Sequence, residues 1–325
     1  MRAAFLIVGC LLFITPTFAQ KTFPEIGVPT SYQRTLLERS DSLQAIVDKT
    51  AGEVIANKHL GPDQLGITLI DLRDAQHLAS GNYRGGEKFY PASVVKLFYL
   101  AAIERRLEDG QAVDTPELER GIHDMIVSSS NEATQYILDV ITGTSSGAEL
   151  PQKEFEAWQY KRNVVNRWFS SLGYADINVD QKTFCEDAYG IEQQSRGYKG
   201  NNRNALTTNV TARLLTEIVL GRVNTPQRTA AMMTLLSRDW SKPSTDTDDQ
   251  PTGFTGRMLI DRKLVGTRLW SKAGWTSTER HDAAYIETPE GLKFVLVVFT
   301  HGHPNDRDII PAIAGKVLDA FERKQ

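Results

Sequence analysis

Ser93 and Lys96 are the residues on which the functional prediction depends. They stand three positions apart at the start of an apolar segment. On a helix that begins at Pro91 or Ala92, this spacing places both side chains on one face, where the lysine amine can take the hydroxyl proton. A serine needs such a base to act as a nucleophile. Alone the pair is a weak signal, because a capping serine followed by a solvated lysine gives the same pattern.

Two further motifs follow along the chain. A Ser-Ser-Asn motif from Ser129 to Asn131 interrupts a helical pattern, and a Lys-Ala-Gly motif from Lys272 to Gly274 ends a predicted strand. Ser129 and Asn131 also suit ordinary helix caps, and Lys272 also suits an edge-strand charge. The three motifs in this order are far more specific than any one of them.

Together, the motifs resemble those of the penicillin-recognising serine enzymes, and most closely the class A β-lactamases, which combine Ser-x-x-Lys, Ser-Asp-Asn and Lys-Thr-Gly. The resemblance covers nearly the whole chain after its N-terminal segment. It implies a serine acyl-transfer site with two groups of residues. These are the catalytic Ser93, Lys96 and Ser129, and the substrate-binding Asn131, Lys272, Gly274 and Trp275.

The resemblance implies a role for each catalytic residue. Ser93 attacks an amide carbonyl and becomes acylated, with Lys96 as general base or proton relay. Ser129 passes a proton to the leaving nitrogen. The backbone N–H groups of Ser93 and Trp275 form an oxyanion hole, where two aimed donors stabilise the tetrahedral oxyanion.

Substrate binding is implied in the same way, with two departures from the family pattern. Asn131 holds Lys96 and the substrate amide, and Lys272 attracts a substrate carboxylate and helps to keep Lys96 neutral. Ser130 stands where the family usually has Asp, and Ala273 stands where it has a hydroxyl residue. The second departure removes a hydroxyl that would contact the substrate carboxylate, although Thr276 or Ser277 could supply one instead.

The family's deacylating glutamate has no clear equivalent in this sequence. Its Glu-x-x-Leu-Asn pattern is absent between Gly173 and Leu206. Glu186, Asp187 and Glu192 are candidates by their position in this loop alone. The sequence therefore leaves open whether an acyl-enzyme would be hydrolysed efficiently.

The elements that must position these residues predict an α+β fold of the α-β-α, β-lactamase/transpeptidase-like type. We expect a mainly antiparallel five-stranded sheet flanked by terminal helices, and a second, all-helical lobe. The predicted strands are residues 64–72, 76–83, 264–272, 283–287 and 292–300. The predicted helices include residues 34–57, 115–126, 132–141, 151–172, 208–219, 226–240 and 310–321.

One folded domain is expected after two N-terminal segments. Residues 1–19 are a predicted signal peptide and residues 20–31 a leader. The serine hydrolase domain is residues 32–325, with its sheet lobe at about 32–90 and 255–325 and its helical lobe at about 91–254. Two stretches without periodicity, residues 174–207 and 241–253, are predicted to be loops.

The first 19 residues have the pattern of a secretory signal. Arg2 precedes an apolar run, and Thr17 and Ala19 are residues of the kind found before a cleavage point. We expect cleavage near Ala19 and a secreted or periplasmic protein. Lipidation at Cys10 is a second, weaker interpretation, because the apolar run continues past it. No later stretch is long enough to span a bilayer.

The composition and net charge of the chain restrict the kinds of partner that we expect it to bind. The chain has 325 residues, 41% apolar and 24% charged, as in ordinary globular proteins. Its net charge of −3 argues against nucleic acid or an anionic membrane. Cys185 is the only cysteine after the signal peptide, so no internal disulfide can form. The six histidines lack ligand spacing, so we expect no metal and no cofactor. The expected state is a monomer with a small-molecule amide substrate, either a β-lactam or a peptidoglycan-like compound.

Three functions fit the sequence. The leading prediction is a β-lactam hydrolase, with the role in β-lactam catabolism and antibiotic resistance that the resemblance implies. The second keeps the site but acts on a cell-wall peptide or another amide or ester, as a penicillin-binding or DD-peptidase-type enzyme, because one fold serves many substrates. The third is a binding protein that keeps the fold without turnover.

Overall fold

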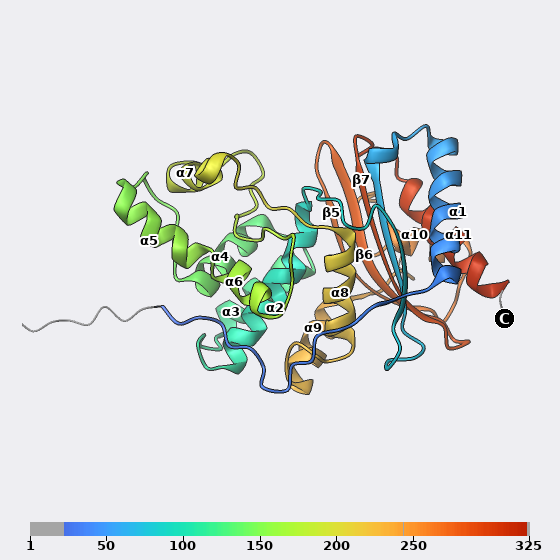
Figure 1. Cartoon of the computed structure of the whole chain (residues 1–325), viewed down its shortest axis with the longest axis horizontal. Coiled ribbons are helices and arrows are strands. Elements are labelled where there is room, and N and C mark those ends of the chain that lie inside the picture. The colour runs from blue at the N-terminus through green and yellow to red at the C-terminus, as the bar shows by residue number, and fades with distance from the viewer. Residues whose placement is uncertain (1–22, 243, 324–325) are drawn as a thin grey trace, which may run out of the picture.

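The computed structural model describes residues 23–242 and 244–323. One mixed sheet lies between a layer of helices and a larger helical region (Figure 1). The predicted signal peptide, Cys10 and the first residues of the leader lie outside the described residues. Within the described part of the chain, no helix is long and apolar enough to cross a membrane.

The sheet has seven strands in the order β1-β3-β2-β7-β6-β5-β4. Their bounds are Glu38–Arg39 (β1), Leu65–Asp71 (β2), Ala79–Tyr83 (β3), Ser237–Arg238 (β4), Arg268–Trp275 (β5), Glu279–Glu287 (β6) and Lys293–His301 (β7). The prediction of five antiparallel strands was imprecise. The five longer strands are antiparallel, but two two-residue strands extend the edges, and β1 pairs with β3 in parallel. Strands of two residues are too short to show the alternation on which the prediction relied.

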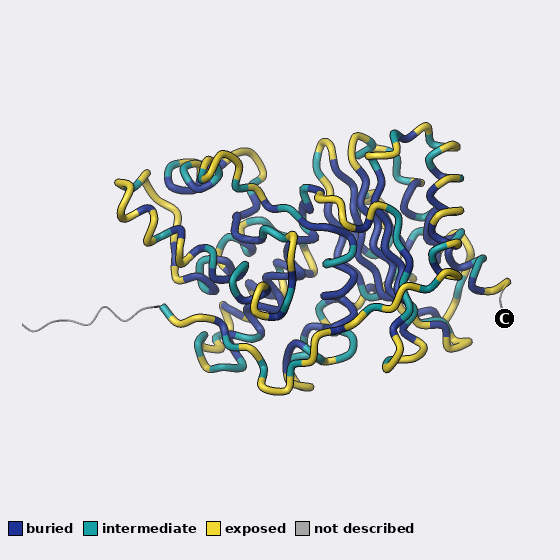
Figure 2. The backbone as a smooth tube through the Cα atoms, in the orientation of Figure 1, coloured by how far each residue is buried: buried dark blue, intermediate teal, exposed yellow. Residues whose placement is uncertain are grey.

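The central strands are buried on both faces (Figure 2). In β7, Val295 and Val297 belong to the apolar core on the side of the helical region. Leu296 and Val298 belong to the core on the opposite side. A strand covered on both faces reads as a continuous apolar run, which is why β7 was found from sequence.

The helices fall into two groups. Those on the outer face of the sheet are α1 (Asp41–Lys58), α10 (Thr255–Asp261) and α11 (Ile309–Glu322). Those on the other side are α2 (Lys96–Glu108), α3 (Pro116–Ile126), α4 (Asn131–Thr142), α5 (Gln152–Arg162), α6 (Val164–Ser171), α7 (Ile191–Arg196), α8 (Thr208–Val219) and α9 (Pro226–Leu236). Short 3-10 turns are η1 (Pro62–Gln64), η2 (Ala92–Val95) and η3 (Tyr198–Gly200). Of the second group, α8 packs directly on β2, β6 and β7.

Helix boundaries follow local capping chemistry. The start of α3 was correctly predicted, because Thr115 caps the helix and Pro116 opens it. The predicted helix 34–57 begins later, at Asp41, where the Ser40 hydroxyl accepts from the N–H of Leu43. The predicted helix 151–172 is two helices, which meet at Asn163.

Two predicted loops are more ordered than expected. Residues 174–207 contain α7 and η3, and isolated bridges join Asn178 to Ala205 and Phe89 to Leu206. Residues 241–253 do form a loop, but its Gln250 is buried. Both segments reach the residues that the three motifs identify.

Candidate active site

The candidate nucleophile lies at a strained turn. The Ser93 helix was predicted, but its first turn is the 3-10 turn η2, and the α-helix α2 begins at Lys96. Ala92, immediately before Ser93, has a φ of 47°. A left-handed non-glycine residue costs roughly 1–2 kcal/mol and is found where the surroundings enforce it, commonly at functional sites. Ser93 is half-buried, and its hydroxyl has no hydrogen-bond partner among the described residues.

The end of β5 lies directly against this turn. A Cβ on Gly274 would lie 2.7 Å from the backbone nitrogen of Ser93 and 2.9 Å from that of Val94. Only glycine allows the two backbones to approach so closely. The contact brings Gly274 and the backbone of Trp275 beside Ser93, as the predicted site requires. The Trp275 ring is 38% exposed and packs against Phe254.

Lys96 is fully buried and makes three polar contacts. Its Nζ lies 2.5 Å from the carbonyl oxygen of Ser129, 3.0 Å from Asn131 Oδ1 and 3.2 Å from Ser129 Oγ. Burial lowers the pKa of Lys96 to about 7. A neutral amine has two hydrogens and one lone pair. It can donate to the two acceptor-only atoms and accept from the Ser129 hydroxyl.

Lys272 approaches the same hydroxyl from β5. Its Nζ lies 3.0 Å from Ser129 Oγ, 2.5 Å from Gln250 Oε1 and 2.8 Å from the carbonyl oxygen of Ala273. Burial and the neighbouring Lys96 lower the pKa of Lys272. Its three contacts can all accept, which matches the three donors of an ammonium group. Lys96 and Lys272 therefore each contact two acceptor-only atoms and share the Ser129 hydroxyl, which can donate to whichever amine is neutral.

The two serines of the Ser-Ser-Asn motif do different things: one caps a helix, and the other contacts the two lysines. Ser130 caps α4, because its hydroxyl accepts from the N–H of Ala133 at 3.0 Å. Ser129 has a φ of 55°, and its hydroxyl lies between the two lysine amines. Asn131 contacts Lys96. Capping thus falls to Ser130, the residue that departs from the family pattern.

Gln250 supports the site, and sequence reasoning missed it. Its Oε1 accepts from Lys272 and from the N–H of Ala273, and its Nε2 donates to the carbonyl groups of Ile126 and Val127. It ties β5 to the segment that precedes Ser129. Its place in a polar, breaker-rich stretch gave no signal that its side chain would be buried.

His281 also supports the site, in a role that the sequence did not indicate. The N–H of Thr300 donates to His281 Nδ1 at 3.1 Å, so Nδ1 carries no hydrogen and Nε2 carries one. Nε2 then donates to the carbonyl oxygen of Tyr90 at 2.9 Å. Burial lowers the pKa of His281 to about 4, which agrees with a neutral ring. This ring holds the segment before Ser93 against β6 and β7.

A cavity of about 510 Å³ opens beside Ser93. Its wall includes Asn131 and Trp275 and three consecutive residues of the 174–207 loop, Cys185 to Asp187. The Asn131 side-chain amide donates to Cys185 Sγ at 3.4 Å. A thiol, which sequence reasoning did not place here, is thus the loop group that contacts Asn131.

The three candidate deacylating carboxylates lie in different surroundings. Glu186 is exposed and lines the cavity. Asp187 also lines it, but its carboxylate pairs with Arg196. Glu192 does not line it. The Glu192 carboxylate is buried and binds Arg162 at 2.8 Å and Ser146 at 2.8 Å, so Glu192 anchors the loop and is unsuited to activate water at Ser93.

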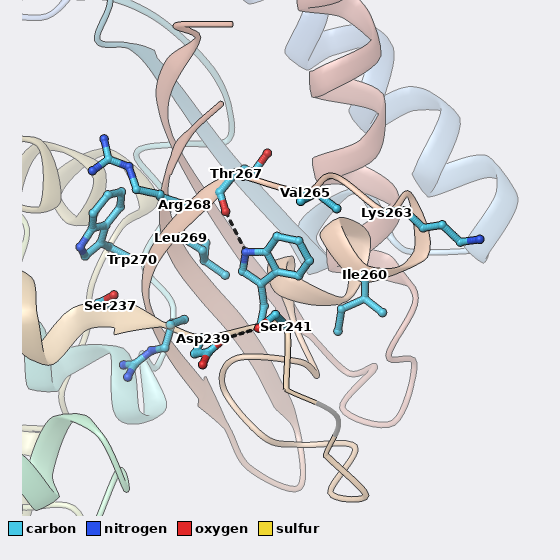
Figure 3. Close-up of a pocket in the computed structure, with 13 residues that line it drawn as sticks. Ser237, Asp239, Ser241, Ile260, Lys263, Val265, Thr267, Arg268, Leu269 and Trp270 are labelled. Carbon is cyan, nitrogen blue, oxygen red and sulfur yellow. Dashed lines mark hydrogen bonds between the residues drawn. The ribbon is translucent and has the colours of Figure 1, made fainter. Parts of the chain in front are cut away.

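A different cavity, of about 580 Å³, lies at the β4–β5 edge and holds none of the predicted site residues (Figure 3). Its wall includes Ile260, Val265 and Leu269. The side-chain N–H of Trp240, which also lines this cavity, donates to the carbonyl oxygen of Thr267 at 3.0 Å. Across the described ranges 23–242 and 244–323, no group of His, Cys, Asp and Glu is arranged to hold a metal ion.

Comparison with known proteins relates the chain to one family. The model of the "Beta-lactamase enzyme family" matches residues 113–321. The match includes the second and third motifs and begins after Ser93 and Lys96. No curated protein matches the sequence significantly.

Solved structures extend the likeness to nearly the whole fold. A β-lactamase from Sphaerobacter thermophilus DSM 20745 is 19% identical, with a TM-score of 0.60 over 85% of this chain and 97% of that one. A β-lactamase from Chitinophaga pinensis DSM 2588 is 14% identical, with a TM-score of 0.60 over 85% and 98%. PBP-A is 17% identical, with a TM-score of 0.59 over 90% and 100%. At these identities the likeness shows the fold.

Proposed function

The chain belongs to the beta-lactamase enzyme family, and from this premise we propose that it is a serine hydrolase that acts on β-lactams through an acyl-Ser93 intermediate. The observation that carries the proposal is the Ser129 hydroxyl, which lies within 3.2 Å of Lys96 Nζ and 3.0 Å of Lys272 Nζ. Two lysine amines on one half-buried hydroxyl form a path for a proton beside Ser93, whose own hydroxyl has no partner among the described residues.

Acylation follows from this arrangement. Neutral Lys96 removes the Ser93 hydroxyl proton as Oγ attacks the lactam carbonyl carbon. The tetrahedral oxyanion accepts hydrogen bonds from the backbone N–H groups of Ser93 and Trp275. As the C–N bond breaks, Ser129 donates its proton to the leaving nitrogen and takes one from the Lys96 ammonium, which returns Lys96 to its neutral form.

Substrate binding uses the neighbouring polar groups. The positive charge on Lys272 attracts the substrate carboxylate, and Asn131 donates to the carbonyl of the substrate's side-chain amide. Ala273 supplies no hydroxyl to the carboxylate. We therefore expect Lys272 to account for more of the carboxylate affinity than it would beside a hydroxyl.

Deacylation distinguishes the leading function from a second one. Hydrolysis of the acyl-serine needs a base that activates water, and Glu186 is the one cavity carboxylate without an ion pair among the described residues. A penicillin-binding enzyme with slow release is the second candidate. The contact of Cys185 with Asn131 favours it, because a thiol occupies a place where a carboxylate could act.

Pre-steady-state kinetics with a chromogenic cephalosporin test the proposal. A β-lactamase should give continuous turnover, and Glu186→Gln should trap the acyl-enzyme. A penicillin-binding enzyme should give a burst of about one equivalent of product followed by little steady state. Sustained turnover in Glu186→Gln would show that Glu186 is not the base.

Mass spectrometry separates both outcomes from a binding protein without chemistry. Wild type exposed to a penicillin should gain one covalent adduct, and Ser93→Ala should gain none. Labelling that survives in Ser93→Ala would refute Ser93 as the nucleophile, and an unlabelled wild type would refute acyl transfer to β-lactams.

A further inference from the structure

Arg203 is a positively charged residue at the cavity beside Ser93, and it forms no ion pair among the described residues. It lines the cavity beside Ser93, is exposed, and pairs with no carboxylate among the residues that the structure describes. The other guanidinium of the cavity, Arg196, binds Asp187 and lies over the Phe184 ring. Arg203 is therefore the guanidinium available to a ligand.

Contacts of its side chain and of its backbone both hold Arg203 in position. Its guanidinium lies 4.9 Å from the centre of the Tyr90 ring, a cation–π contact. Its carbonyl oxygen accepts from the Asn178 amide at 2.8 Å, and Asn178 and Ala205 exchange backbone hydrogen bonds. Tyr90 is held in turn by His281. A preorganised guanidinium binds a carboxylate at a lower entropic cost than a freely moving one.

The place of the cavity indicates which part of a substrate reaches Arg203. Its wall includes Ser93 and Trp275, which flank the reacting carbonyl in the proposed function, and lacks Lys272. A substrate whose ring carboxylate faces Lys272 therefore places its acyl substituent in this cavity. Arg203 would meet that substituent.

We propose that Arg203 makes the enzyme selective for substrates whose acyl substituent carries a carboxylate. The inference rests on the proposed function, because it assigns the substituent side from the acylation geometry. Guanidinium binds carboxylate in a bidentate manner, with charge-assisted hydrogen bonds. Glu186 adds a negative charge to the same cavity, so selectivity depends on direct contact with Arg203 and not on the net charge of the cavity.

Three penicillins that differ at one carbon provide the test. Benzylpenicillin has a neutral acyl substituent, carbenicillin adds a carboxylate to it, and ampicillin adds an ammonium. We expect wild type to be acylated faster, at low concentration, by carbenicillin than by the other two. Arg203→Gln should lower the carbenicillin rate constant about tenfold, the effect of 1.4 kcal/mol, and change the benzylpenicillin rate constant little.

Two further variants make the result specific. Arg203→Lys keeps the charge but loses the bidentate fork, so it should retain only part of the selectivity. Lys199→Gln removes an exposed charge from the same loop outside the cavity and should leave the ratio of carbenicillin to benzylpenicillin unchanged. Thermal unfolding of each variant checks that the fold is kept.

The outcomes separate this inference from the proposed function. Equal acylation ratios in wild type and Arg203→Gln, with both enzymes acylated, would overturn the role of Arg203 and leave the proposed function intact. Failure of all three penicillins to acylate Ser93 in wild type would overturn the proposed function and this inference with it. A carbenicillin preference that is lost in Arg203→Gln, reduced in Arg203→Lys and kept in Lys199→Gln would support the inference.

Discussion

At the scale of single residues, the site depends on which lysine holds the proton. Lys96 and Lys272 each have two acceptor-only neighbours, and they share the Ser129 hydroxyl as the third. Two ammonium groups on one hydroxyl would repel each other in a buried site, so the pair titrates as a unit. In the proposed mechanism Lys96 is the neutral base for the nucleophile, and Lys272 keeps the positive charge for the substrate.

We predict an acid limb in the pH dependence of acylation. Burial lowers the pKa of Lys96 to about 7, so the neutral base is lost as pH falls below that value. The acylation rate constant should fall about tenfold per pH unit below the limb and level off above it. Stopped-flow acylation by benzylpenicillin between pH 5 and 9 measures this profile.

Variants of the two lysines test which group causes the acid limb of the acylation pH profile. Lys96→Ala should lower the plateau by roughly 10²–10⁴-fold, the usual contribution of a general base. Lys272→Met removes a like charge, which should raise the pKa of Lys96 and move the limb to higher pH. A limb that stays in place in Lys272→Met would argue against coupling between the two amines.

Residues of the motifs could be predicted from sequence, while their supporting residues could not. Ser93, Lys96 and Lys272 stand in short patterns whose spacing has a chemical reason. Gln250 and His281 act through contacts with segments far away in the chain, and their neighbours in sequence carry no sign of this. Such contacts depend on tertiary packing, which single-sequence patterns do not encode.

At the scale of elements, the site depends on the approach of β5 to η2. Gly274 and Ser93 stand 181 positions apart in the sequence, and β5 holds its place through its ladder with β6. The motif predicted that they meet. The tightness of the contact follows only from the structure, where η2 packs against both β5 and β6.

We predict that Gly274→Ala impairs acylation more than stability. The added Cβ would lie 2.7 Å from the Ser93 nitrogen and 3.0 Å from the Pro91 carbonyl oxygen, which are backbone atoms and cannot rotate away. A displacement near 1 Å at a reacting centre can cost about 10²-fold in rate. Gly86→Ala is the matched control, because nothing lies within 4 Å of its added Cβ. Normal acylation by Gly274→Ala would show that β5 can shift without consequence.

His281 should make the fold sensitive to acid. Its pKa is lowered from 6.5 to about 4, so between these values the unfolded chain binds a proton that the folded chain does not. Stability from this group is therefore present above pH 6.5 and is lost as pH falls toward 4, by roughly 3 kcal/mol in all. Urea unfolding at pH 7 and pH 4.5 should show a smaller acid loss for His281→Gln than for wild type. Equal losses would exclude His281 as a source of the acid sensitivity.

Element boundaries show where sequence patterns have limits. Apolar runs located β2 and β7, and Thr-Pro pairs located the starts of α3 and α9. The break at Asn163 was missed because apolar residues continue in helical spacing across it. The spacing of apolar residues shows which face of a helix is buried, but it does not show where one helix ends and the next begins in a new direction.

At the scale of the whole molecule, the segment 23–37 connects the helical region to the sheet. The segment has no helix or strand and runs along the helical region to β1 (Figure 1). The Trp168 N–H donates to the carbonyl oxygen of Gly27, and Arg106 donates to that of Pro24. Farther along, the N–H of Thr35 donates to the Glu217 carboxylate in α8. The sequence suggested an extended leader, and these contacts attach its described part to the helical region.

Because hydrogen bonds attach this segment to the helical region at several points, we predict that its one buried apolar side chain contributes to global stability. Ile26 is 5% exposed and belongs to the core on the side of the helical region, whereas Val28 on the same segment is 43% exposed. Ile26→Ala should lower the free energy of unfolding by about 2–5 kcal/mol, through lost burial and a residual cavity. Val28→Ala should change it by less than about 0.5 kcal/mol. Urea unfolding of both variants measures the difference, and acylation of Ser93 in the folded Ile26→Ala protein should be normal. Equal, small effects of the two substitutions would show that the segment is only loosely attached and that the helical region is stable without it.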